Sequence, residues 1–445
     1  MNSELKNKME LMIDLSKKYG ADTSDVILSK GESFSLSAQN GEIDTYKVSG
    51  SQVIGIRAIK DNKIGISYTE SLDDESLETA VKAAIENAKN SEINEYENIC
   101  IESNDNINPS EFTKDNTSTT DKIDFTLKLE SEVKKRDSRV QSVPYNGLSE
   151  VDSQSYYMNS LGTFCFKSEY YQSCYTSALL HEGDNNAMHY HSSLARNMKD
   201  LDMEFCISES LLHASEWING VPLTTGFYDL IFTTDAMSEL FGCFTNIYSA
   251  KGAMERTNPF ADLLGKQVAG SGLTIKDIPK YKDAFSKYYT DSEGVMQKDL
   301  TLIENGRLNS FYHNTATANF FKTTTTGHGS RGAKGALGVS GTTKVISRGK
   351  TSDSDITSGE YFEVHALDGL HSGANAISGE FSFAARGYLC QDGKRVQPVK
   401  GVTVSGNFHT LLLDINIIGD TMHSTNSKSF FSPILRFEAI SVAGK

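Results

Sequence analysis

Residues 34–48 read FSLSAQNGEIDTYKV, and residues 53–68 read VIGIRAIKDNKIGISY. Each stretch alternates between apolar and polar residues, as a strand with one buried face does. Each also contains a dipeptide that favours a tight turn, Asn-Gly at 40–41 and Asp-Asn at 61–62. The two stretches therefore predict two β-hairpins built from four short strands.

Amphipathic helices are expected on both sides of these hairpins. Apolar residues recur every three or four positions in residues 1–19 and again in residues 72–90, which is the spacing of one helical face. Gly20 follows the first of them, at a position where glycine commonly ends a helix. Helix, four strands and helix together predict a small α+β unit.

The remaining sequence continues this pattern and then changes character. Helices are expected over residues 122–135 and 201–218, with strand-like runs between them. A buried strand at 228–232 and a helix at 235–250 follow. From Leu273 onward the chain reads as short strands separated by glycine-rich and polar turns.

The predicted fold class is α+β. An N-terminal α/β unit of hairpins and helices is followed by a β-rich C-terminal domain that is sandwich- or barrel-like. Asn219-Gly220, just after a predicted helix, is a natural boundary. This gives an N-terminal α+β domain over residues 1–220 and a C-terminal β-rich domain over residues 221–445.

Composition excludes several classes of protein. The 445 residues carry 58 acidic and 43 basic side chains, a formal net charge of −15. Such a surface repels a nucleic-acid backbone, so direct nucleic-acid binding is not expected. No run of about 18 apolar residues is present, so no membrane association is expected. The six cysteines lie far apart without a CxxC pair, which indicates reduced thiols and a cytoplasmic location.

His181, Glu182, His189 and His191 form the most tempting group of zinc ligands. A zincin HExxH motif places two histidines one helical turn apart, but position 185 is asparagine here. His189 and His191 could still chelate a metal from alternate positions of a strand. A polar surface strand explains the same residues more simply. A stand-alone metallohydrolase that uses this cluster is therefore kept as an alternative.

Residues 327–332 read GHGSRG and fit the pattern GxGxxG. A dinucleotide-binding loop needs a hydrophobic strand before it and a helix after it. Here a run of threonines precedes the motif and more glycines follow it. A flexible glycine loop near a binding surface is the better interpretation, and it makes Gly327 and Gly329 candidate substrate contacts.

Residues 367–407 hold the most specific motifs of the chain. They contain NAISGEFS at 375–382, the turn dipeptide Asp-Gly at 392–393, and PVKGVTVSGN at 398–407. Two antiparallel hairpins would account for the alternation and for the turn. They would leave these particular residue types unexplained.

These motifs resemble the TldD/PmbA family, which carries similar stretches of N-x-x-S/T-G-D/E-F-S and P-V-K/E-G-x-T-I/V-x-G-N. The resemblance extends to Gly55-Ile56-Arg57, to NSLG at 159–162 and to Ser432-Pro433, and so covers essentially the whole chain. It implies a cytoplasmic subunit of a dimeric metalloprotease assembly that handles peptides.

The two branches of this family differ in their metal chemistry. TldD-like members carry HExxxH on the helix after the central strand and a further ligand near the C-terminus. Here that helix reads DAMSELFGCFTN at 235–246, with Asp235 and Glu239 as its carboxylates and no histidine, and no cysteine follows Cys390. The resemblance is therefore to PmbA/TldE, formerly described as a modulator of DNA gyrase. It implies no catalytic residue, no metal ligand and no cofactor in this chain.

The resemblance also implies a heterodimer with a TldD-like HExxxH subunit, which would hold the zinc, and unfolded peptide as substrate. The peptide would bind along exposed strand edges through its backbone. A homodimeric peptide-binding scaffold is the second alternative. The residues expected to bind substrate are His371, Asn375, Ser378, Glu380 and Ser382, together with Gly327 and Gly329.

Overall fold

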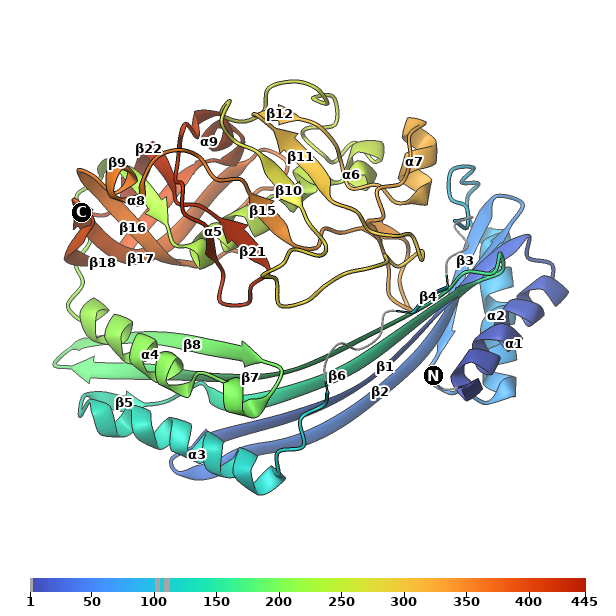
Figure 1. Ribbon diagram of the computed structural model, residues 1–445, viewed down its shortest axis with the longest axis horizontal. Helices are drawn as coiled ribbons and strands as arrows, with labels where there is room; N and C mark the ends of the chain where they lie inside the picture. Colours follow the sequence, from blue (N-terminus) through green and yellow to red (C-terminus); the bar gives the residue numbers. More distant parts are fainter. Residues whose placement is uncertain (1–2, 101–104, 108–112) are drawn as a thin grey trace.

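The computed structural model describes residues 3–100, 105–107 and 113–445. Figure 1 shows a long, curved sheet formed by the first half of the chain, lying below a rounder β-rich body formed by the second half. Helices and strands are mixed throughout, which confirms the predicted α+β class. The Asn-, Glu-, Asp- and Ser-rich residues 91–120 are predicted to form a loop, and part of this stretch lies outside the described residues.

In the described part of the first half, the chain forms an eight-stranded sheet flanked by helices. The strand order is β3-β2-β1-β6-β7-β4, and β5 and β8 also pair with β7. The elements are α1 (Ser3–Lys18), β1 (Thr23–Gln39), β2 (Glu42–Lys60), β3 (Lys63–Thr69), α2 (Asp74–Asn90), β4 (Asp105–Ile107), α3 (Thr119–Arg136), β5 (Val140–Ser142), β6 (Asn146–Asn159), β7 (Phe164–Glu182), β8 (Asn185–Ala195) and α4 (Met203–Trp217).

The prediction of four short strands near the N-terminus was wrong. β1 and β2 are single strands of 17 and 19 residues that pair along their whole length, and β3 completes the group. The residues 49–52, which separate two of the predicted strands, continue β2 because pairing with β1 satisfies their backbone groups. Both turns were predicted correctly, and Asn40 and Asp61 adopt φ values of 57° and 53°, as tight hairpin turns require.

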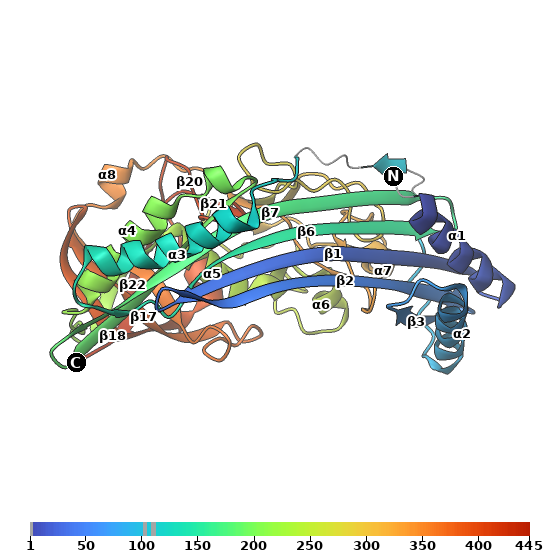
Figure 2. The same cartoon turned by 90° about the horizontal axis from the view of Figure 1, so that it is seen from below.

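The helices cover opposite ends of the sheet, as Figures 1 and 2 both show. α1 and α2 pack on one end, where Met9 and Val81 join one apolar cluster with β1 and β2. α3 and α4 pack toward the other end, where Leu129 and Ile207 join a second cluster with β6 and β7. All four helices were predicted, because each presents a continuous apolar face.

The second half is built around a closed five-stranded barrel. β9, β16, β17, β18 and β22 follow the order β18-β17-β16-β9-β22, and the barrel closes because β18 also pairs with β22. The barrel-like form of the predicted β-rich region is thus confirmed. Its strands are β9 (Gly226–Phe232), β16 (Glu360–Asp368), β17 (Glu380–Gln391), β18 (Lys394–Asn407) and β22 (Leu435–Ala443).

A second, six-stranded sheet and several short helices surround the barrel. The strand order of this six-stranded sheet is β12-β11-β10-β15-β21-β20. The elements are α5 (Thr234–Cys243), α6 (Ala250–Met254), β10 (Ile275–Asp277), β11 (Leu300–Glu304), β12 (Arg307–Leu308), α7 (Thr315–Phe321), β13 (Gly329–Ser330), β14 (Gly338–Val339), β15 (Lys344–Ile346), α8 (Asp353–Ile356), α9 (Phe408–Asp414), β19 (Ile417–Ile418), β20 (His423–Ser424) and β21 (Phe430–Ser432).

The helix predicted over residues 235–250 is shorter than expected. α5 ends at Cys243, because Phe244 leaves the helical conformation with a φ of −116°. The Phe244 ring is fully buried and stacks on Phe408 at 4.4 Å between ring centroids. Packing of the Phe244 ring therefore ends the helix, although the apolar periodicity of the sequence continues beyond this residue.

Two expectations from composition can be compared with the structure. Among the described residues, no helix is long and apolar enough to cross a membrane. All six cysteines are described and none forms a disulfide, as expected for reduced thiols.

A buried ionic cluster joins the sheet to the second half of the chain. Arg57 on β2 contacts Asp25 on β1 at 2.5 Å, and Arg331 from the second half contacts the other oxygen of Asp25 at 2.7 Å. Glu293, also from the second half, lies 3.8 Å from Arg57. The side chains of these four residues are fully buried. We call these four residues the junction cluster.

Close contact at this junction depends on a glycine. A Cβ atom at Gly55 on β2 would lie 1.8 Å from the carbonyl oxygen of Ala333, which belongs to the second half. We expect Gly55→Ala to lower the free energy of unfolding by about 1–3 kcal/mol, because the added methyl group forces the two halves apart. Urea denaturation measures the change.

Gly50→Ala is the matched control, since Gly50 lies on the same strand and a Cβ atom there would meet nothing within 4 Å. This variant should keep or slightly raise the stability, because alanine restricts the unfolded chain more than glycine does. Equal stability of the two variants would contradict the proposed close contact.

Candidate functional site

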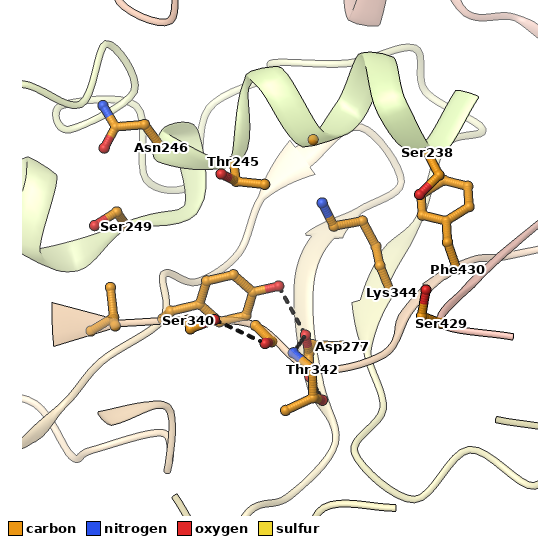
Figure 3. A pocket seen from close by; sticks show the side chains of 14 residues that line it. Ser238, Thr245, Asn246, Ser249, Asp277, Ser340, Thr342, Lys344, Ser429 and Phe430 are labelled. Carbon is orange, nitrogen blue, oxygen red and sulfur yellow. Dashed lines mark hydrogen bonds between the residues drawn. The ribbon is translucent and has the colours of Figure 1, made fainter. Parts of the chain in front are cut away.

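A pocket of about 450 Å³ opens beside α5 (Figure 3). Thr233 begins the helix, with its hydroxyl accepting from the backbone N–H of Ala236, and its own N–H donates to Val364 on the barrel at 3.0 Å. One face of α5 is buried in the core, which leaves Ser238 and Gly242 at the pocket. The other polar side chains that line the pocket are Thr245, Asn246, Ser249, Asp277, Tyr312, Ser340, Thr342, Lys344 and Ser429.

Asp277, at the end of β10, is fixed by several donors. Tyr312 donates its hydroxyl at 2.9 Å and Thr342 its backbone N–H at 2.7 Å, and the hydroxyl of Thr342 also donates. His328 places Nε2 3.3 Å from the same carboxylate. Burial alone would raise the pKa of Asp277, but the contacts from His328 and Thr342 lower it. The protein itself thus satisfies this carboxylate and keeps it ionised.

Lys344, on β15, contributes a cationic ammonium group to the pocket (Figure 3). Its Nζ lies 5.0 Å from the centroid of the Tyr248 ring and 6.0 Å from that of Phe241, within reach of cation–π attraction. Burial lowers the pKa of Lys344 to about 8, although the charge of Asp277 acts in the opposite direction. No carboxylate in the described part of the chain forms an ion pair with this ammonium group.

The carboxylates of α5 lie one helical turn apart. The side chains of Asp235 and Glu239 reach solvent, but protein atoms crowd their carboxyl groups. The resulting partial desolvation raises the pKa of both groups. Asp235 also accepts a hydrogen bond from the backbone of Asn426 at 3.2 Å. A zinc site needs at least three protein ligands. Within residues 3–100 and 113–445, no group of three His, Cys, Asp or Glu side chains could hold a metal ion, and α5 itself offers two carboxylates.

Five of the seven predicted substrate-binding residues lie together, on the loop before β17 and at its start. The Asn375 side chain accepts from the backbone N–H groups of residues 377 and 378, and the Ser378 hydroxyl lies 3.3 Å from the Glu380 carboxylate. His371 and Ser382 are exposed nearby. This loop is next to α5, because the thiol of Cys243 lies 4.0 Å from the carbonyl oxygen of residue 370.

The other two predicted residues, Gly327 and Gly329, lie elsewhere and are buried. Gly329 donates its N–H to Asp291 at 2.7 Å, and a Cβ atom there would lie 2.7 Å from the Glu293 carboxylate. The expected surface loop is therefore an ordered part of the core, beside the junction cluster. Two carboxylates occupy the space next to Gly329, and the backbone of residues 296 and 297 occupies the space next to Gly327.

The histidine cluster proposed for a stand-alone metallohydrolase comes together only in part. His181 on β7 pairs with Asn186 on β8, so it shares a face of the sheet with residues 188 and 190. His189 and His191 point to the opposite face. His189 packs against Trp217 at 5.1 Å between ring centroids, and burial lowers its pKa to about 2. Strand alternation thus separates His181 from His189 and His191, whose ring centroids lie 6.2 Å apart on the other face.

No motif in the sequence points to Asp277, Tyr312 or Lys344. Each lies in a segment without a recognisable motif, and their neighbourhood arises only when β10 pairs with β15. His328 was noticed only as part of the glycine pattern. The one local signal is a lysine at the start of a short apolar strand, which is too common to single out Lys344.

Family models match the chain in three blocks. Residues 225–444 match the PmbA/TldA metallopeptidase C-terminal domain, residues 24–88 match domain 1, and residues 113–212 match the central domain. These blocks cover most of the sequence.

Several relatives are similar over nearly their whole length. The metalloprotease PmbA of Escherichia coli O157:H7 is 21% identical over 92% of this chain and 89% of its own. An uncharacterised protein of Methanocaldococcus jannaschii is 24% identical, over 93% and 95%.

Solved structures show the same fold. A proposed modulator of DNA gyrase from Thermotoga maritima superposes with a TM-score of 0.87 at 25% identity, covering 99% of this chain and 100% of that one. TldE from Thermococcus kodakarensis superposes with a TM-score of 0.84 at 22% identity, covering 98% and 100%. Together with the family models, this likeness shows that the chain belongs to the PmbA/TldD family of metallopeptidases.

Proposed function

We propose that this chain is a PmbA/TldE-like subunit of a TldD/TldE-type metalloprotease that processes or degrades unfolded peptides. Zinc would be held by a TldD-like partner that carries HExxxH. The assembly would act in the cytoplasm, with this chain contributing an N-terminal domain over residues 1–220 and a C-terminal domain over residues 221–445. Any effect on DNA gyrase would be indirect, since the net charge of −15 opposes contact with DNA.

The residue content of α5 is the observation that carries this proposal. The resemblance places HExxxH of the TldD-like branch on this helix. Here its polar positions are Thr234, Asp235, Ser238 and Glu239, and no third ligand stands near the two carboxylates within the described residues. A catalytic zinc site would lack the donors it requires.

The loop beside α5 supports a role in holding peptide. His371, Asn375 and Ser382 are exposed, and they lie next to the helix that carries zinc in the TldD-like branch. Backbone N–H groups in this loop are already bonded to the Asn375 side chain, so the loop has a fixed shape. A fixed loop can orient an extended substrate at low entropic cost.

Co-expression with an HExxxH paralogue from the same organism tests the proposal. The two chains should co-purify as a heterodimer, with zinc in the partner and peptidase activity only in the pair. Glu239→Gln in this chain should leave the zinc content unchanged, whereas replacing a histidine of the partner's HExxxH should abolish it.

Two results would overturn this proposal. Stoichiometric zinc in the purified chain alone, lost on substitution of Glu239, would make this chain itself a metalloenzyme. A stable homodimer that binds unfolded peptide and never associates with the paralogue would favour the homodimeric scaffold instead.

A further inference from the structure

The pocket beside α5 contains polar groups that the protein leaves unused. Among the described residues, the ammonium group of Lys344 has neither an ion pair nor a hydrogen bond, and the hydroxyls of Ser238 and Thr245 have no protein partner. The buried hydroxyl of Tyr248, whose ring lies beneath Lys344, is also unpartnered. Figure 3 shows Lys344 directed toward α5, which carries Ser238, and toward the turn after it, which carries Thr245.

The charges of the pocket select the kind of anion. A single ammonium group and neighbouring hydroxyls can bind a carboxylate through charge-assisted hydrogen bonds. Asp277 is ionised nearby and already satisfied by Tyr312, Thr342 and His328. Its negative charge disfavours a doubly charged phosphate, and no arginine lines the pocket to offset it. A singly charged carboxylate is the better match.

The size of the pocket indicates that the carboxylate belongs to a larger molecule. The volume of about 450 Å³ lies in the range of sites for ligands well above the size of acetate. Several hydroxyl and amide groups line it in addition to the cation, and they can bond to peptide groups.

We infer that this pocket binds the C-terminal carboxylate of a peptide, with Lys344 as counter-ion and Ser238 and Thr245 as hydrogen-bond donors. The choice of a peptide rests on the proposed function, whereas the carboxylate site itself does not. The aromatic faces of Tyr248 and Phe241 hold the ammonium group in position without neutralising its charge.

Calorimetric titration of the full chain with N-acetyl-tetraalanine tests this inference. The peptide with a free carboxylate should bind about tenfold to a hundredfold more tightly than its C-terminal amide, because the amide lacks the charge that pairs with Lys344. Lys344→Met, which keeps the length and the apolar stem, should remove this difference. Lys276→Met should retain it, because Lys276 precedes Asp277 on β10 and therefore faces away from the pocket.

A labelling experiment on the unaltered protein gives an independent measurement. The free-acid peptide should protect Lys344 from acetylation by an N-hydroxysuccinimide ester, as measured by mass spectrometry of the digested protein, and the amide should not. This result does not depend on the folding of any variant.

Three outcomes would overturn the inference. They are equal binding of acid and amide, unchanged discrimination in a folded Lys344→Met variant, and binding of sodium acetate as tight as that of the peptide. The last result would assign the pocket to a small carboxylate. If the chain binds the free acid through Lys344 but joins no HExxxH paralogue, the carboxylate site stands and only the proposed function fails.

Discussion

Replacement of Arg57 by methionine is expected to lower the free energy of unfolding by about 3–5 kcal/mol. The Arg57 side chain is fully buried and contacts Asp25 at 2.5 Å and Glu97 at 2.8 Å. Methionine fills a similar space, so the loss arises because these carboxylates lose the cation that neutralises them. Urea denaturation followed by the fluorescence of Trp217, the single tryptophan, measures the change where α4 meets the barrel.

An exposed ion pair across the same junction provides the control. Lys334 contacts Glu70 at 2.8 Å, and about half of the Lys334 side chain is exposed to solvent. Lys334→Met should therefore change the free energy of unfolding by no more than about 1 kcal/mol. If Arg57→Met lowers the free energy of unfolding as little as Lys334→Met does, burial does not strengthen the contribution of these ion pairs to stability.

Local signals in the sequence were sufficient where local interactions set the structure. The apolar stripe of α1, with Leu5, Met9 and Met12, is buried as its spacing predicted. The turn between β17 and β18 occurs at Asp392-Gly393, where both residues adopt positive φ values of 50° and 74°. The identity of the turn residues and the helical periodicity are properties of a few neighbouring residues, so the sequence alone reveals them.

Long-range pairing determined what the sequence analysis missed. The sequence predicts separate strands at 163–168 and 170–180, but β7 is one strand, because β6 pairs with it on both sides of residue 169. Residues 49–52 of β2 are strand for the same reason. The length of a strand therefore depends on the neighbouring strand. It cannot be predicted from the apolar pattern of one segment alone.

The arrangement of the candidate site depends on long-range pairing even more strongly than strand length does. The loop around Asn375 was identified from its unusual residues, but its position beside α5 follows from the barrel topology. Lys344 and Asp277 meet in one pocket because β10 and β15 are adjacent. Gly329 was interpreted as part of a flexible surface, whereas the Asp291 and Glu293 carboxylates that surround it come from a distant segment.

Replacement of Glu293 by glutamine is expected to change how stability depends on pH. Burial, reinforced by the charge of Asp291, raises the pKa of Glu293 from 4.5 to about 8. Between these values the folded protein holds a proton that the unfolded chain releases. The contribution of Glu293 to stability is thus fully present below about pH 4.5 and is lost as the pH rises toward 8, by about 1.4 kcal/mol per pH unit. Glutamine has the same shape and no charge, so it escapes this loss.

The difference in unfolding free energy between Glu293→Gln and the unaltered protein should grow in favour of the variant from pH 5 to pH 8 and level off above pH 8. Urea denaturation at each pH measures it. Glu70→Gln is the control, because the ion pair with Lys334 lowers the pKa of Glu70 and leaves it ionised throughout this range. Parallel pH profiles for Glu293→Gln and the unaltered protein would mean that Glu293 is ionised in the fold.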